Sequence, residues 1–214
     1  MTAPGPTVAH WWEDRALPRL MDVVLADRVA GRWRRELCAD VVGDVLEVGF
    51  GSGRNLPFYP PAVHAVLAVE PSDVAWERAR PRVAEFGRRV DRVGLDGSSL
   101  EGVGDASVDA VVSAWTMCSI PDLPAALAEV RRVLRPGGRL HFVEHSLAPD
   151  PGVARAQRAL QPGWGRLAGG CHLDRDIPAE LAAAGLVAAD LRSRYVARGP
   201  ARPWAWFCTG SAPA

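Results

Sequence analysis

Three glycines follow a short apolar run and could form a ligand-binding turn. The run ends at Val48, and Gly49, Gly51 and Gly53 come next at alternating positions. Glycines at this spacing let the backbone turn tightly and let a ligand lie directly against peptide groups. The dinucleotide pattern Gly-x-Gly-x-x-Gly differs, because Arg54 stands where its third glycine would be. The spacing therefore favours S-adenosylmethionine over NAD as the bound nucleoside.

An acidic residue ends the next apolar run and could complete the same site. Glu70 directly follows Val69 and stands 17 residues after Gly53. A carboxylate at the end of a strand can accept hydrogen bonds from both hydroxyls of a ribose, and open parallel sheets bind ligands at these strand ends. The glycines and Glu70 thus point to one nucleoside site. The alternative is a structural turn beside a solvated glutamate.

Two histidines are candidates for a general base, which assists methyl transfer when the acceptor must lose a proton. His145 stands beside Glu144, whose carboxylate could orient the imidazole ring, and His172 lies in a Gly-Gly-Cys-His segment. For both, an ordinary hydrogen-bonded structural histidine is the alternative. The five histidines lack the spacing of metal ligands, so we expect no metal site.

Strands and helices alternate around these residues. Continuous apolar runs, typical of strands covered on both faces, occur at 44–48, 65–69, 90–95, 108–113 and 140–143. Ser72 and Asp122 are placed to cap helices between these runs, and another helix is expected from Asp176 to Ala184. The last runs, 187–196 and 203–208, predict an antiparallel pair. This order predicts an α/β sandwich around a mostly parallel, seven-stranded sheet.

The N-terminal region predicts an amphipathic helix with Gly31 as its plausible end. Its apolar stripe consists of Leu17, Leu20, Met21, Val24 and Leu25. We expect residues 8–31 to form a lid over an apolar acceptor site, with permanent packing against the sheet as the alternative. The flanking charges are mixed, whereas a membrane-surface helix concentrates basic residues on its polar face.

Composition excludes several classes of function. The chain of 214 residues fits one domain, and its 25 acidic and 25 basic residues cancel, which argues against a nucleic-acid partner. Every basic residue is arginine, so lysine-dependent chemistry is excluded. The sequence shows no secretory signal and no apolar run long enough for a bilayer. The four cysteines lie at least 37 positions apart, so we expect a reduced, cytoplasmic protein without a disulfide framework.

Three segments together resemble the motifs of class I S-adenosylmethionine-dependent methyltransferases. They are Glu-Val-Gly-Phe-Gly-Ser-Gly at 47–53, Glu70, and Arg-Val-Leu-Arg-Pro-Gly-Gly at 132–138, within a resemblance over about residues 42–146. Segments 53–61, 142–145, 161–164 and 169–173 are similar to the methyltransferase-like family that includes the animal thiol S-methyltransferases. The chain departs from that family at its membrane-associating N-terminal segment, because several arginines lie near the helix here.

The resemblance implies a Rossmann-like methyltransferase sandwich with an N-terminal helical lid. It implies a single domain over 1–214, with a lid (1–40), a cofactor core (41–146), an acceptor-side insertion (147–175) and a C-terminal helix and strand pair (176–214). The implied reaction is methyl transfer from S-adenosylmethionine to a small lipophilic acceptor, first of all a thiol. The alternatives are an O- or C-methyltransferase of a quinone-like or natural-product acceptor, and a catalytically idle cofactor-binding module that acts through a partner.

Carried over by position, the resemblance also implies which residues line the site. The cofactor set is Glu47, Gly49, Gly51, Gly53, Asn55, Glu70, Pro71, Asp96, Gly97, Ala114 and Trp115. The acceptor set is Trp11, Trp12, Trp164, Cys171 and His172, with His145 as the catalytic base. The alternative role of Asp96 is that of a turn residue. The alternative role of Trp115 is packing in the core.

Overall fold

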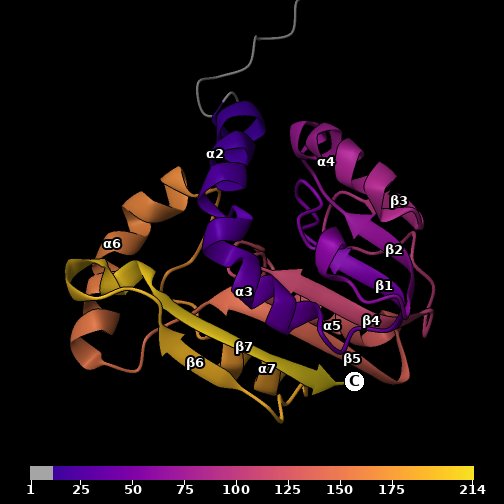
Figure 1. The fold of residues 1–214 in the computed structure, drawn as a ribbon. Coiled ribbons are helices and arrows are strands. Elements are labelled where there is room, and N and C mark those ends of the chain that lie inside the picture. Colours follow the sequence, from indigo (N-terminus) through magenta and orange to yellow (C-terminus); the bar gives the residue numbers. More distant parts are fainter. Residues whose placement is uncertain (1–11) are drawn as a thin grey trace, which may run out of the picture.

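The computed structural model describes residues 12–214 and contains one seven-stranded sheet with helices on both faces (Figure 1). The strands are β1 (Gly43–Val48), β2 (Val63–Val69), β3 (Arg89–Gly94), β4 (Val108–Ala114), β5 (Leu134–His145), β6 (Arg192–Tyr195) and β7 (Trp206–Pro213). The helices are α2 (Leu17–Val24), α3 (Asp27–Cys38), α4 (Asp73–Phe86), α5 (Leu123–Val133), α6 (Pro151–Leu167) and α7 (Ile177–Ala183). Shorter turns are the π-helical η1 (Trp12–Ala16) and the 3-10 turns η2 (Leu56–Phe58) and η3 (Gly199–Trp204).

The strand order is β3-β2-β1-β4-β5-β7-β6. Neighbouring strands from β3 to β5 are parallel, and β7 pairs antiparallel with both β5 and β6. The chain moves outward from β1 in both directions, so the strand order reverses between β1 and β4. This arrangement confirms the predicted α/β sandwich with its antiparallel C-terminal pair.

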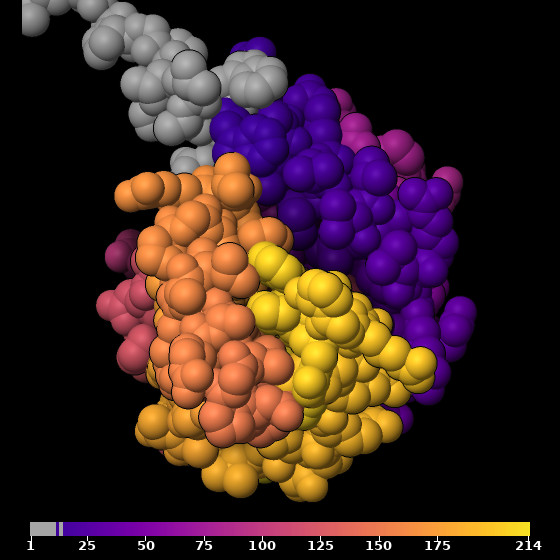
Figure 2. All heavy atoms as spheres, turned by 90° about the vertical axis from the view of Figure 1, so that its left-hand side faces the viewer, coloured from indigo at the N-terminus to yellow at the C-terminus, as the bar shows by residue number. Residues whose placement is uncertain are grey.

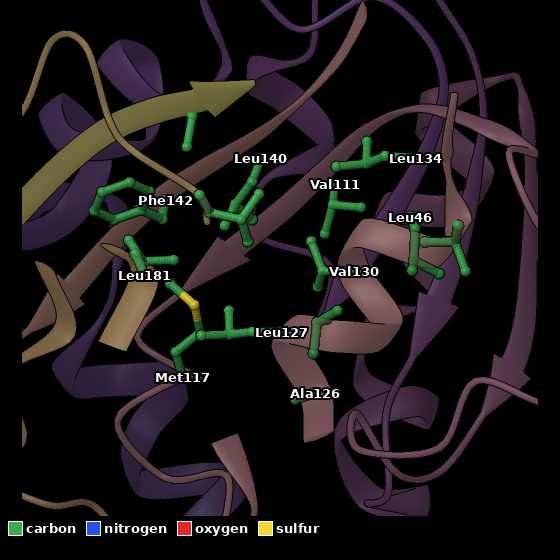
Figure 3. Packing of buried hydrophobic residues seen from close by; sticks show 14 of the residues in the cluster. Leu46, Val111, Met117, Ala126, Leu127, Val130, Leu134, Leu140, Phe142 and Leu181 are labelled. Atoms are coloured by element: carbon green, nitrogen blue, oxygen red, sulfur yellow. The ribbon is translucent and has the colours of Figure 1, made fainter. Parts of the chain in front are cut away.

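Two apolar clusters hold the helices on the two faces of the sheet. On one face, α5 and α7 pack on strands β1, β4, β5 and β7, and Figure 3 shows Leu127 and Val130 of α5 facing Val111 and Leu140. On the other face, Trp33 and other residues of α3 pack with α4 and η2 against β1, β2 and β4. The parallel strands are apolar on both sides because both sides are covered.

The predicted helix starts at Ser72 and Asp122 are confirmed. The Ser72 hydroxyl accepts a hydrogen bond from the Ala75 N–H at 3.2 Å, and an Asp122 carboxylate oxygen accepts one from Ala125 at 3.0 Å. These bonds satisfy backbone donors that have no partner within the helix. No helix within residues 12–214 is both long and apolar enough to cross a membrane.

The predicted end of the N-terminal helix at Gly31 is wrong. Helix α2 ends at Val24, Ala26 adopts an extended conformation, and α3 continues through Gly31, which packs near the Phe58 ring. The predicted apolar stripe also divides, because Leu20 and Val24 are 45% and 48% exposed. Because of this break, α3 packs on the sheet, and only α2 and the residues at its end can cover a site.

The region after β5 contains a helix that the sequence did not predict. Helix α6 runs through Pro162 and Gly163, two residue types that normally interrupt a helix.

Strand β5 is longer than its apolar run, because it begins at Leu134 and includes the Pro-Gly-Gly segment. The Pro-Gly-Gly segment itself has no partner in β4 or β7, because the β4 register shifts between Leu134 and Arg139 and the β7 pairing begins at Arg139.

Candidate functional site

A pocket of about 230 Å³ opens at the carboxyl ends of β1, β2 and β4. Its lining at the strand ends includes the polar Glu47, Asn55 and Glu70, the backbone of Gly49 and Gly51, and Ala114. Its apolar lining includes Leu17, Pro18, Met21 and Leu25, from α2 and its end. Figure 1 shows α2 and α4 side by side at this end of the sheet. The pocket lies where strand order reverses, which is the usual ligand site of open α/β sheets.

Two glycines of the turn after β1 have different tasks. Both have a positive φ, +76° at Gly49 and +59° at Gly51. A Cβ on Gly49 would overlap the Thr116 side chain, so this position allows the turn to pack against the loop after β4. A Cβ on Gly51 would meet only the Gly49 carbonyl oxygen, 3.9 Å away. Gly51 therefore leaves open space beside bare backbone, as the sequence predicted for a ligand site.

The Glu70 carboxylate is fixed by backbone donors on both sides of the pocket. One oxygen accepts a hydrogen bond from the Gly51 N–H at 2.6 Å, and the other accepts one from the Ser72 N–H at 2.7 Å. Burial raises the pKa of Glu70, although these two N–H donors oppose the shift. The carboxylate thus joins the glycine turn to the start of α4 and lines the pocket itself.

A second buried carboxylate, Glu47, lies at the pocket floor. It accepts hydrogen bonds from the Asn55 side-chain amide at 2.9 Å and from the Tyr59 hydroxyl at 2.6 Å. Burial raises the pKa of Glu47 to about 7, against the effect of these two donors. The Asn55 Oδ1 is buried and has no hydrogen-bond partner. Because buried polar atoms are normally paired, this oxygen suits a ligand that brings an N–H or O–H donor.

Asp22 of α2 connects the roof of the pocket to its floor, and sequence analysis did not identify it. Its carboxylate is 8% exposed and accepts hydrogen bonds from the Ser52 hydroxyl and the Arg54 Nε, both at 2.6 Å, and from Arg78 of α4. Burial opposes ionisation, but the hydrogen bonds from Ser52, Arg78 and Arg54 outweigh it and lower the pKa of Asp22 to about 2. Arg54, the residue that departs from the dinucleotide pattern, therefore binds α2.

Arg34 lines a further side of the pocket, and Trp115, which the sequence predicted, packs against Arg34 from outside the lining. Arg34 lines the pocket, is 4% exposed, donates to the Leu25 carbonyl oxygen at 2.8 Å and lies 5.2 Å from the Trp115 ring centre. Burial lowers the pKa of Arg34, and its Nε has no hydrogen-bond partner. Trp115 has a φ of +54°, a conformation that a bulky residue rarely adopts outside functional sites.

Five residues of the predicted cofactor set do not line this pocket: Gly53, Pro71, Asp96, Gly97 and Trp115. Asp96 is exposed and accepts a hydrogen bond from the Ser98 N–H at 2.8 Å, which is the turn role left open above. Gly97 packs against Val48, since a Cβ there would lie 2.9 Å from that side chain. Ala114, the neighbour of Trp115 in the sequence, does line the pocket.

The predicted acceptor residues gather where α6 meets the N-terminal turn. The Trp12 indole N–H donates to the Leu167 carbonyl oxygen at 3.0 Å. Trp164 packs against Trp204 at 6.1 Å between ring centres, and its own indole nitrogen is buried without a partner. Figure 2 shows α6 in orange beside the indigo N-terminal helices. Trp11 lies outside the described residues.

The candidate base His145 lies at the end of β5, packed edge-on against Phe207 at 6.0 Å between ring centres. The expected contact with Glu144 is absent, because that carboxylate faces the loop after β4. Burial lowers the pKa of His145 to about 4; the Pro203 carbonyl opposes this shift but makes no hydrogen bond of normal geometry. His145 is 6% exposed and does not line the pocket.

We expect Asp22→Asn to loosen α2. A carboxyl pKa lowered from 3.8 to about 2 corresponds to ~2–3 kcal/mol, present above pH ~4 and lost as the pH falls toward 2. Because the charge binds α2 to the pocket, hydrogen exchange over Leu17–Val24 should accelerate by ~10–100-fold while β1 and β4 stay protected.

The matched control for this variant is Asp27→Asn. The Asp27 side chain is 51% exposed and lies 3.4 Å from Arg54, so its loss should cost less than ~1 kcal/mol. Equal exchange rates in the two variants would contradict the role of Asp22.

Comparisons with known proteins agree with this geometry. Residues 46–142 match the family model of a methyltransferase domain. The chain is 36% identical over 138 residues to the thiol S-methyltransferase TMT1B of Rattus norvegicus, covering 62% of this chain and 55% of the relative. It is 33% identical over 175 residues to TMT1B of Homo sapiens, covering 74% of this chain and 70% of the relative. The chain thus spans between about half and two thirds of the length of these relatives.

Other relatives have different acceptors in their names. The chain is 31% identical to a phosphatidylethanolamine N-methyltransferase of Cereibacter sphaeroides, with 77% of each chain covered. It is 32% identical to the ubiquinone/menaquinone C-methyltransferase UbiE of Dinoroseobacter shibae, covering 65% of this chain and 54% of the relative.

The fold itself also matches solved structures. A SAM-dependent methyltransferase of Thermotoga maritima, described as a possible histamine N-methyltransferase, superimposes with a TM-score of 0.64 at 19% identity. The match covers 94% of this chain and 99% of the other. The chain therefore belongs to the class I methyltransferase family, which uses S-adenosylmethionine as its cofactor, and is related to the thiol S-methyltransferases.

Proposed function

We propose that this protein transfers a methyl group from S-adenosylmethionine to the sulfur of a small lipophilic thiol. The observation that carries the proposal is a single pocket with a polar strand-end floor and an apolar roof from α2. The floor suits a nucleoside cofactor, and the roof suits an acceptor without charge. The thiol S-methyltransferases among the relatives support the choice of sulfur.

Within the pocket, the cofactor set divides by chemistry. Glu70 would accept the ribose hydroxyls with the lone pairs that the backbone leaves free. Gly49 and Gly51 would carry the methionine part against bare backbone. Asn55, with its unpaired buried oxygen, and Glu47 beside it would receive the cofactor's ammonium group.

The remaining predicted residues contribute from around the pocket. Ala114 and Trp115 would border the sulfonium end, because they end β4 beside the apolar roof. Asp96 and the neighbouring Gly97 would approach the adenine only if the loop after β3 closes. Trp12, Trp164, Cys171 and His172 would form the outer acceptor wall near the end of α6.

The reaction itself needs little from the side chains. The bound cofactor supplies an activated methyl group that a nucleophile displaces in line. The protein aligns the acceptor and excludes water, which can contribute up to ~7–11 kcal/mol to the barrier reduction in favourable cases. Helix α2 performs the exclusion, held over the pocket by Asp22. Thiols ionise near pH ~8.5 and so need no strong base.

The second candidate is a C- or O-methyltransferase of a quinone-like acceptor, favoured by the UbiE relatives. Incubation with methyl-labelled S-adenosylmethionine and a matched panel of lipophilic thiols, phenols and quinols separates the two. Label in the thiol products alone supports the proposal. Label in the quinols or phenols, with the thiols unreacted, would support the second candidate and contradict the proposed thiol activity. Cofactor binding without any labelled product would indicate a catalytically idle module.

For the cofactor site, we expect Gly51→Ala to weaken S-adenosylmethionine binding at least about tenfold, or ~1.4 kcal/mol. The added Cβ would enter open space beside the ligand. Gly87→Ala is the matched control, since Gly87 has a similar φ of +66° and nothing within 4 Å of a Cβ. Both variants should lose ~1–2 kcal/mol of folding stability, but only the first should lose affinity in calorimetry. A similar affinity in both would place the ligand elsewhere.

Replacing the ribose acceptor should also weaken binding. We expect Glu70→Ala to lower the affinity for S-adenosylmethionine by ~1.5–3 kcal/mol, as for a charged hydrogen bond. Glu77→Ala on α4, whose side chain is 62% exposed, should leave the affinity unchanged. NAD should not bind measurably to either form. An unchanged affinity of Glu70→Ala would overturn the strand-end assignment.

The role of His145 depends on the acceptor. A pKa of about 4 leaves His145 neutral at neutral pH but makes it a weak base, and it lies outside the pocket lining. We propose that it serves as the base only for an acceptor that extends from the pocket to its ring, in which case His145→Ala should lower phenol or quinol methylation by ~10²–10⁴. With a thiol, the pH–rate profile should follow the acceptor's own pKa in both wild type and variant. A thiol profile that changes with the mutation would make His145 the base for thiols too.

A further inference from the structure

Two cysteines that are far apart in the sequence meet beside the acceptor wall. Cys118 lies in the loop after β4 and Cys171 lies after α6, and their sulfur atoms are 3.5 Å apart. The His172 N–H donates to the Cys118 carbonyl oxygen at 2.8 Å, so the two backbones are tied together next to the sulfurs. The other two cysteines, Cys38 and Cys208, are fully buried in the core.

The two thiols of the pair differ in exposure and acidity. Cys118 is 2% exposed, whereas Cys171 is only half-buried. The contact with Cys118 lowers the pKa of Cys171, and burial opposes this shift. The nearby Trp164 side chain also lowers the pKa of Cys171. The same contact and burial raise the pKa of Cys118. The more exposed Cys171 would therefore attack and the buried Cys118 would resolve, because the thiolate is the reactive form and needs access to the disulfide.

We propose that Cys171 and Cys118 form a reversible dithiol–disulfide site that reacts with low-molecular-weight disulfides. The Cys171 thiolate attacks one sulfur of a disulfide RSSR, forming a mixed disulfide and releasing RS⁻, which takes up a proton. Cys118 then gives up its proton and attacks the Cys171 sulfur, forming the internal disulfide and releasing the second RSH. The protein loses two protons and two electrons, and RSSR is reduced to two RSH.

The internal disulfide requires a short approach of two sulfur atoms whose backbones are already held in place. The sulfurs must approach by ~1.5 Å to reach a bond length of about 2.05 Å. The Cys171 carbonyl oxygen accepts a hydrogen bond from Gln161 at 3.3 Å, and the Cys118 N–H donates to Glu144 at 3.3 Å. These bonds fix both backbones, so the approach of the sulfurs must come from rotation of the two side chains. The pairing needs no oxidant beyond the small disulfide itself.

The pair also lies close to the roof of the pocket. Gly169 packs so tightly against Leu17 of α2 that a Cβ at Gly169 would overlap this side chain. Leu17 in turn lines the pocket. The segment that carries Cys171 is therefore in direct contact with the first turn of α2. Closing the disulfide would fix this segment to the loop after β4, beneath the end of the lid.

Non-reducing peptide mapping tests the proposal on the full chain. The reduced protein is treated with bis(hydroxyethyl) disulfide, its free thiols are blocked with iodoacetamide, and it is digested with trypsin. Cleavage after arginine places Cys118 in 93–131 and Cys171 in 167–175. We expect these two peptides to be joined and the intact protein to lose two hydrogen atoms. A lasting adduct on Cys171 without the cross-link, or no reaction at either cysteine, would overturn the proposal.

Three variants assign the order of the two steps. Cys118→Ser should stop at a stable mixed disulfide on Cys171, because the resolving thiol is gone. Cys171→Ser should leave Cys118 at least ~10-fold less reactive than Cys171 is in the wild type. Cys208→Ala, the matched control, should still form the cross-link. If Cys118 reacted as fast without Cys171 as the wild type does, the assigned order of attack would be wrong.

Discussion

Buried carboxylates at the strand ends hold the loops from which the site is built. Glu47 in β1 binds the side chains of Asn55 and Tyr59, and Glu70 after β2 binds the backbone of the glycine turn. Glu144 in β5 is fully buried and accepts the backbone N–H groups of Thr116, Met117 and Cys118 together with the Ser113 hydroxyl. A buried carboxylate that lost these donors would cost several kcal/mol, so each one fixes the conformation of its loop. The hydrogen bonds of these buried carboxylates thus fix the floor of the pocket in the absence of a ligand.

The roof is held by different forces. Helix α2 has eight residues, too few to be stable on its own in water. Its inner face contributes Leu17 and Met21 to the pocket lining, while Leu20 is exposed on the other side. Its main polar connection to the rest of the chain is the Asp22 network, whereas Trp33 anchors α3 in the core. Helix α2 is thus held by one ionic network and by local contacts such as that of Leu17 with Gly169, whereas α3 is fixed in the core below it.

The sequence predicted those parts of the site that follow from local patterns. Continuous apolar strands, the glycine turn and Glu70 at a strand end are short-range signals, and the structure places them together as expected. The contact of Asp22 with Arg54 and that of Cys118 with Cys171 join residues 32 and 53 positions apart, so no periodicity connects them. Helix α6 was not predicted for a related reason. Its Pro162 and Gly163 disfavour a helix locally, and tertiary packing stabilises the helix in spite of them.

The position of the histidine bears on which acceptors the site favours. Proton abstraction requires a base within hydrogen-bond reach of the acceptor, and His145 is packed against Phe207 outside the pocket lining. The titratable groups that do line the pocket are already engaged: Glu47 with Asn55 and Tyr59, Glu70 with the backbone, and Asp22 with arginines. A pocket arranged in this way offers alignment and water exclusion more readily than proton transfer. This arrangement is consistent with the proposed thiol acceptor, because a thiol with a pKa of ~8.5 already forms some thiolate at neutral pH without a base.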